Sequence, residues 1–178
     1  PNADWVDRVQ SSRTFGKIMT GPEYFSIFNG RTGAAMASVP YIPGREPTGG
    51  WGGIGGNGGM ETTTTGNRVN RFLACGAYLD GVHPSVIMCR GYYGRSVLAA
   101  WDWRDGKLTQ RWIFDSDDGT PGNEAYRGQG NHQLSVADVD GDGKDEIVYG
   151  ACVIDDNGKG LYSTGRAHGD AMHVSDLD

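Results

Sequence analysis

Hydrophobic and polar positions alternate in short segments along this chain, and most segments end in Asp, Asn or Gly. Residues 24–28 read Tyr-Phe-Ser-Ile-Phe, lead into Asn29-Gly30, and are followed by a second apolar segment at 34–39. Residues 96–103 turn at Arg104-Asp105-Gly106 and return as residues 108–114. Short runs of β-branched and aromatic residues closed by turn residues are typical of antiparallel strands. The pattern predicts two β-hairpins and an all-β fold.

Two longer segments repeat one pattern. Residues 72–81 align with residues 132–141 at an offset of 60, and the strands expected at 86–89 and 146–149 keep that offset. Repeats of about 40 to 60 residues with four strands each are typical of propeller blades, whereas the strands of a β-sandwich would not repeat in this way. We therefore predict a partial β-propeller with blades of four antiparallel strands.

The repeat divides the chain into parts of one propeller domain. We expect the end of a blade at 23–47, a full blade at 67–127, a second at 131–167, and the start of a third at 168–178. Because these parts cannot close a ring and leave blade faces uncovered, we expect a fragment that needs the rest of the propeller and is inactive alone. Residues 48–66, rich in Gly and Thr, are expected to be a mobile loop with few side chains to pack.

The amino-acid composition further limits the fold and the partners that we expect. Asp outnumbers Glu 17 to 5 and 30 of the 178 residues are Gly, which favours turns over helices. A net charge of −6 argues against a nucleic-acid partner, and no segment approaches the roughly 18 apolar residues of a membrane span. Cys75, Cys89 and Cys152 lie in apolar segments and are expected to be buried free thiols, with a Cys75–Cys89 bridge as the alternative.

The sharpest motif is an acidic turn after the strand expected near 132–137. Its carboxylates stand at positions 1, 3, 5 and 9: Asp138, Asp140, Asp142 and Glu146. Gly143 permits a tight turn at position 6, and the Lys144 carbonyl is available at position 7, so oxygen atoms surround one centre as calcium requires. An EF-hand would need Glu where Tyr149 stands. We predict a strand-to-strand calcium loop, with a metal-free acidic turn as the alternative.

Two histidines precede equivalent first strands of adjacent blades. His132 and His168 should therefore lie on the same rim of the propeller, where Asp170 follows closely in the sequence. A structural, hydrogen-bonded role is the alternative for each histidine. Imidazole suits transition metals better than calcium, so spacing alone leaves the metal undecided. The Asp-x-Asp of the acidic turn recurs at Asp176 and Asp178, which would begin a second calcium loop.

A third candidate group lies at a strand end, where Tyr92, Tyr93 and Arg95 follow Arg90-Gly91. A guanidinium group can grip a carboxylate through two hydrogen bonds, and tyrosine faces stack on sugar rings. The group would fit an acidic sugar. The alternative is a packed tyrosine pair with solvated arginines.

Several sequence segments are long and rare: residues 66–74 (Gly-Asn-Arg-Val-Asn-Arg-Phe-Leu-Ala), 100–108 (Ala-Trp-Asp-Trp-Arg-Asp-Gly-Lys-Leu), 138–146 and 168–173 (His-Gly-Asp-Ala-Met-His). Together they resemble the family 11 rhamnogalacturonan lyases, from about residue 20 to the end. The resemblance implies an eight-bladed, calcium-rich propeller secreted by pectin-degrading microbes. It also implies a polysaccharide substrate, rhamnogalacturonan I, whose rhamnose-galacturonate backbone is cleaved by β-elimination.

The resemblance also implies roles for the candidate residues. It makes the 138–146 carboxylates a structural calcium site, and it makes His132, His168 and Asp170 ligands of a calcium in the cleft. It gives no position for the general base. Two departures from the family pattern are Trp51-Gly-Gly53 in place of Trp-Gly-Asp, and Asn70 in place of Asp. The alternative function is a non-catalytic, integrin-like calcium-binding propeller that holds carbohydrate or protein, which would explain the acidic loop but not the histidines.

Overall fold

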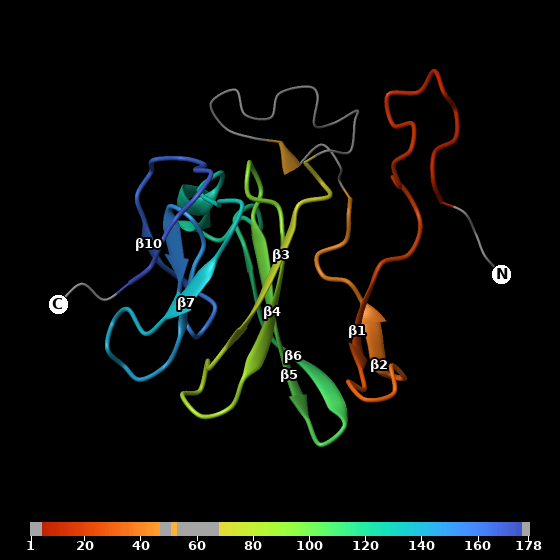
Figure 1. Cartoon of the computed structure of the whole chain (residues 1–178). Coiled ribbons are helices and arrows are strands. Elements are labelled where there is room, and N and C mark those ends of the chain that lie inside the picture. Colours follow the sequence, from red (N-terminus) through yellow and green to blue (C-terminus); the bar gives the residue numbers. More distant parts are fainter. Residues whose placement is uncertain (1–4, 47–50, 53–67, 176–178) are drawn as a thin grey trace.

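A computed structural model of the chain describes residues 5–46, 51–52 and 68–175 (Figure 1). Its strands are β1 (Tyr24–Phe28), β2 (Ala35–Pro40), β3 (Phe72–Ala77), β4 (Ser85–Arg90), β5 (Val97–Arg104), β6 (Lys107–Asp115), β7 (Ser135–Ala137), β8 (Glu146–Val148), β9 (Cys152–Ile154) and β10 (Gly160–Ser163). A short 3-10 helix, η2 (Asn123–Tyr126), follows β6. Within these ranges the chain contains no α-helix, and no helix there is long and apolar enough to cross a membrane.

The strands form three antiparallel sheets. β1 and β2 make a two-stranded sheet, while β3–β6 and β7–β10 make two four-stranded sheets whose strands are neighbours in chain order. Both predicted hairpins are present, and Gly33 and Gly106 adopt φ angles of 71° and 73° in their turns, a region that favours glycine. The all-β prediction is confirmed. The described residues form no closed barrel or propeller.

The β3–β6 sheet lies between the other two (Figure 1), and its inner strands β4 and β5 pack against apolar clusters on both faces. Along β5, Leu98 and Ala100 belong to the apolar cluster shared with β8 and β9, whereas Ala99 and Trp101 belong to the cluster shared with β1. Successive side chains of a strand point to opposite faces, so a strand covered on both sides needs an uninterrupted apolar run. The run from Val97 to Trp101 therefore reflects burial between two sheets.

The free-thiol prediction is confirmed for the cysteines. All three are free, although only Cys89 and Cys152 are buried and Cys75 is half-buried. The register of β3 against β4 places Cys75 opposite Ile87 and Cys89 opposite Leu73. The two thiols of the alternative bridge are therefore not cross-strand partners. Burial raises the pKa of the Cys75 thiol to about 12.

The structure describes residues 51–52 of the glycine-rich segment. Trp51 is fully buried against Val69 and Val97, and its indole nitrogen donates to the Arg45 carbonyl oxygen at 2.8 Å. A Cβ atom on Gly94 would lie only 1.3 Å from the Gly52 carbonyl oxygen, so this approach requires glycine. Trp51 is therefore one side chain of this segment that does pack in the core. The remaining residues of 48–66 lie outside the described ranges.

Candidate metal centres

The acidic loop connects β7 to β8, and its first carboxylate anchors the turn. Asp138 Oδ1 accepts hydrogen bonds from the backbone N–H groups of Gly141 at 2.7 Å and Asp142 at 3.1 Å. Its Oδ2 accepts from the Gly143 N–H at 3.0 Å. Gly141 and Gly143 adopt positive φ angles of 80° and 87°, which bend the loop around this carboxylate. The Asp and Gly spacing thus folds the loop as the sequence predicts.

Glu146 is the buried member of the loop, and its carboxylate lies in an unfavourable electrostatic environment. Its side chain is fully buried, Oε2 accepts from the Val139 N–H at 2.7 Å, and Oε1 has no hydrogen-bond partner among the described residues. Burial raises the pKa of Glu146, and the nearby carboxylates of Asp140 and Asp142 raise it further. A buried, unpaired carboxylate oxygen facing other carboxylates fits a cation ligand, because the cation would supply both the missing partner and the opposite charge.

Two groups of carboxylates meet at Glu146. Oxygens of Asp138, Asp140 and Glu146 lie within 4.8 Å of one another, and so do oxygens of Asp142, Glu146 and Asp156. Sequence reasoning missed Asp156, which is 8% exposed and lies after β9. The Asp155-Asp156-Asn157-Gly158 turn could have indicated it, since β9 pairs with β8 and brings that turn beside the loop.

The side chain of Lys144 forms ion pairs with two carboxylates of the loop region, Asp142 and Asp156. Its ammonium group lies 2.7 Å from Asp142 Oδ2 and 3.3 Å from Asp156 Oδ2. These contacts lower the pKa of Asp142. The sequence prediction used the Lys144 carbonyl as a ligand, whereas the ammonium already supplies one positive charge to the Asp142 and Asp156 side of the loop. The Asp138, Asp140 and Glu146 side has no such partner in the described residues.

The second centre lies at the other end of β7, where His132 precedes the strand. A parallel bridge between Asn131 and Gly169 holds residues 130–132 beside residues 168–170. This bridge brings the predicted side chains together: Asp170 Oδ1 lies 3.5 Å from His132 Nε2 and 3.7 Å from His168 Nε2. The three residues form a group whose ligand atoms lie within 4.8 Å of one another.

The backbone fixes the tautomer of His168. Its Nδ1 lies 2.7 Å from the Gly130 carbonyl oxygen, which only accepts, so Nδ1 carries the proton and Nε2 offers a lone pair. That Nε2 is buried without a hydrogen-bond partner in the part of the chain that the structure describes. Burial lowers the pKa of His168. A neutral imidazole whose other nitrogen is bonded to a carbonyl fits a metal ligand.

Tyr92 and Tyr93 form the wall behind this histidine cluster. The rings are 4% and 8% exposed, Tyr92 stacks on His168 at an interplanar angle of 8°, and the Tyr93 hydroxyl lies 2.9 Å from His132 Nε2. Arg95 is paired through two hydrogen bonds with Asp115, at 3.0 and 2.6 Å. In this chain both tyrosines are buried and the Arg95 guanidinium group already holds a carboxylate, and a substrate-binding role for the three residues stays a prediction.

The sequence of this chain matches a known protein family over almost its whole length. Residues 2–178 match the family described as rhamnogalacturonan lyase family 11, C-terminal domain. The chain belongs to this family. Family 11 members with curated names include the rhamnogalacturonan exolyase YesX and the rhamnogalacturonan endolyase YesW of Bacillus subtilis (strain 168), 58% and 51% identical over 163 residues. The matches cover 92% of this chain but 25% and 24% of those proteins, so the chain spans about a quarter of their length.

Solved structures of family 11 agree with the fold described above. A rhamnogalacturonan lyase from Bacillus licheniformis matches with a TM-score of 0.86 at 55% identity, over 99% of this chain and 27% of that one. The exotype lyase YesX matches with a TM-score of 0.85 at 55% identity, over 99% of this chain and 26% of that one. The three-sheet arrangement is therefore shared with family 11 enzymes.

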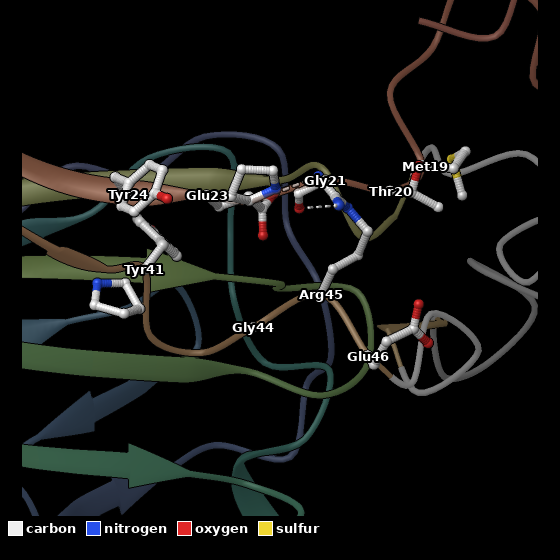
Figure 2. Close-up of a pocket in the computed structure, with 11 residues that line it drawn as sticks. Met19, Thr20, Gly21, Glu23, Tyr24, Tyr41, Gly44, Arg45 and Glu46 are labelled. Carbon is white, nitrogen blue, oxygen red and sulfur yellow. Dashed lines mark hydrogen bonds and ion pairs between the residues drawn. The ribbon is translucent and has the colours of Figure 1, made fainter. Parts of the chain in front are cut away.

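A cavity of about 560 Å³ lies apart from both centres, beside β1 and β2 (Figure 2). It is lined by residues 19–24, 40, 41 and 44–46. In its wall, Glu23 Oε1 accepts from Arg45 at 2.7 Å and from the fully buried Arg90 at 2.6 Å. The cavity lining includes no residue of either candidate metal centre.

Asp176 and Asp178, the predicted start of another loop, lie outside the described residues.

Proposed function

We propose that the protein containing this chain is a calcium-dependent lyase that cleaves the rhamnose-galacturonate backbone of rhamnogalacturonan I by β-elimination. One observation carries the proposal: His132, His168 and Asp170 converge in a family whose named members are rhamnogalacturonan lyases. Two imidazoles and a carboxylate that meet at one point form a ligand set that an inert calcium-binding repeat does not need.

The chemistry of the substrate explains why a cation belongs at this cluster. Removing the weakly acidic C5 proton of galacturonate builds negative charge on the adjacent carboxylate, after which the bond at C4 breaks. A cation held between these ligands would supply positive charge beside that carboxylate and lower the barrier. The exposed carboxylate of Asp170, with 93% of its side chain accessible, leaves the outer side of the cluster open to a substrate.

The chain's own residues prepare this site. The Gly130 carbonyl fixes the proton of His168 on Nδ1, so its Nε2 faces Asp170 in the form that binds a cation. Gly130 can lie there only as glycine, because a Cβ atom would meet the Tyr92 Cβ at 2.3 Å. Tyr92 and Tyr93 cover the inner side of the cluster, where both rings are buried.

The acidic loop takes a different part in the proposal. Asp138, Asp140, Asp142 and Glu146 would hold a structural calcium between β7 and β8, supported by the unpaired buried oxygen of Glu146. We also propose that the three sheets are consecutive parts of an eight-bladed propeller, and that the protein is secreted. Burial of β5 on both faces supports the propeller, since a blade inside a propeller packs against a neighbour on each side.

The test is an assay with rhamnogalacturonan I and the full-length protein. A lyase produces an unsaturated uronate, so ultraviolet absorbance should rise with time, stop when a chelator is added, and return with added calcium. Homogalacturonan, which lacks rhamnose, serves as the control substrate and should give no signal. Chain cleavage without ultraviolet absorbance, or binding without cleavage, would refute the proposed reaction, and the second result would favour the non-catalytic propeller.

A further inference from the structure

The hydroxyl group of Tyr93 touches the nitrogen that a cleft cation would need. Tyr93 Oη lies 2.9 Å from His132 Nε2, and the same Nε2 faces Asp170 Oδ1 at 3.5 Å. The distance between Tyr93 and His132 is that of a hydrogen bond. A cation bound beside Asp170 would need this same Nε2 atom, so Tyr93 and the cation are two alternative partners of one nitrogen.

The two partners exclude each other in either tautomer of His132. If Nε2 carries the proton, it donates to the tyrosine oxygen and has no lone pair for a cation. If Nε2 is unprotonated, its single lone pair accepts the tyrosine proton. An imidazole nitrogen must be unprotonated and free to ligate a metal, so the bond to Tyr93 and a bond to a cation cannot coexist.

We propose that Tyr93 competes with the cleft cation for His132 Nε2 and thereby sets the calcium affinity of the site. The inference rests on the proposed function, since it assumes that the cation binds at His132, His168 and Asp170. Calcium binding breaks the Tyr93–His132 hydrogen bond, and the cost of breaking it lowers the affinity. His168 has no such competitor, because its Nδ1 is bonded to Gly130 and its Nε2 has no partner in the described chain.

The packing around Tyr93 keeps its hydroxyl at the site after the bond breaks. The Arg68 guanidinium lies 3.5 Å above the ring centroid, and the His168 ring centroid lies 4.2 Å away. With its ring 8% exposed and in contact with both groups, Tyr93 has little room to turn away. Calcium binding therefore releases a hydrogen-bond donor beside Asp170, where it can meet the carboxylate of an acidic sugar.

The test compares Tyr93→Phe with the wild type in the full-length protein, by calorimetric titration of calcium chloride into chelator-stripped samples. The binding step of the cleft is the one that His168→Ala removes. Because a net hydrogen bond is worth about 0.5–1.5 kcal/mol, Tyr93→Phe should tighten that step by about two- to tenfold. Tyr41→Phe is the matched control. It also removes a buried tyrosine hydroxyl, one that donates to the Cys89 carbonyl oxygen at 2.8 Å, but Tyr41 lies outside both carboxylate and histidine groups, so the calcium affinity should equal that of the wild type.

A second measurement needs no variant of Tyr93. In protein labelled with nitrogen-15 at histidine, the Nε2 resonance of His132 should report a hydrogen bond in the stripped state and a metal bond after titration. Finding the same hydrogen-bonded Nε2 in both states would overturn the competition.

The outcomes separate this inference from the proposed function. If no calcium step is removed by His168→Ala, the cleft cation itself is absent and both proposals fail. If the step exists and Tyr93→Phe leaves its affinity unchanged, only the competition fails. If Tyr93→Phe weakens the step, Tyr93 is a ligand, and the competition is again refuted while the proposed function stands.

Discussion

The acidic loop and the histidine cluster lie at opposite ends of β7 and are built in different ways. The candidate ligands of the loop lie within nine consecutive residues, and the first of them, Asp138, accepts hydrogen bonds from backbone N–H groups of the same turn. The cluster draws its candidate ligands from two segments 36 residues apart, around 132 and 168, which the Asn131–Gly169 bridge and the bond from His168 to the Gly130 carbonyl hold together. The loop is a local structure and the cluster is a product of the tertiary fold.

This difference assigns the two centres different energetic roles. A cation in the loop would neutralise Glu146, which lies fully buried with an unpaired oxygen, so its binding free energy would add to folding. A cation in the cluster would bind beside Asp170, whose side chain is exposed in this chain. We therefore expect the loop to control stability and the cluster to control turnover.

The largest expected effect comes from the cluster. In the full-length protein, His168→Ala should lower the rate on rhamnogalacturonan I by about a hundredfold or more, because it removes a ligand from the group that stabilises the developing charge. Because the His168 side chain is only 7% exposed and stacks on Tyr92, the melting temperature should also fall, so the rate is expressed per folded molecule. Initial rates and thermal melting on one preparation measure both quantities.

The control for this variant is His173→Ala, which truncates an exposed histidine five residues further along the chain. It should leave the rate unchanged. A near-normal rate in His168→Ala would remove the ligand assignment and return that histidine to a structural role.

The loop should give the reverse result. Asp140→Ala removes one carboxylate from the group around Glu146, so the protein should lose calcium-linked stability and melt about 5 °C lower at saturating calcium. Activity per folded molecule should be largely kept. Wild-type protein in chelator is the reference, since it should show the same loss of loop-linked stability. A melting temperature that responds neither to calcium nor to this substitution would refute the metal loop.

These two centres also show how far sequence reasoning reaches. The loop could be predicted because its ligands and its two turn glycines, Gly141 and Gly143, are contiguous, and local spacing determines local geometry. Asp156 was missed because it joins the loop only through the pairing of β8 with β9. For the cluster, the spacing suggested that His132 and His168 share a rim, but the ligand set came from the family resemblance. The burial of Tyr92 and Tyr93 depends on packing between two sheets, which no local pattern contains.

The smallest expected effect concerns a contact by which the loop supports the neighbouring sheet. Asp145 Oδ2 accepts from the Tyr78 N–H at 2.7 Å, and the Asp145 N–H donates to the Tyr78 carbonyl at 3.2 Å, so the loop is tied to the turn after β3. Asp145→Ala should cost about 0.5–1 kcal/mol of stability, and the Tyr78 amide should exchange its proton faster. Asp145→Asn keeps an acceptor oxygen and should cost less. Asp145 lies outside the carboxylate groups at Glu146, so calcium affinity should change far less than in Asp140→Ala. Equal loss of calcium affinity in both variants would mean that Asp145 belongs to the metal centre, and the separation between ligands and supporting contacts in this loop would be wrong.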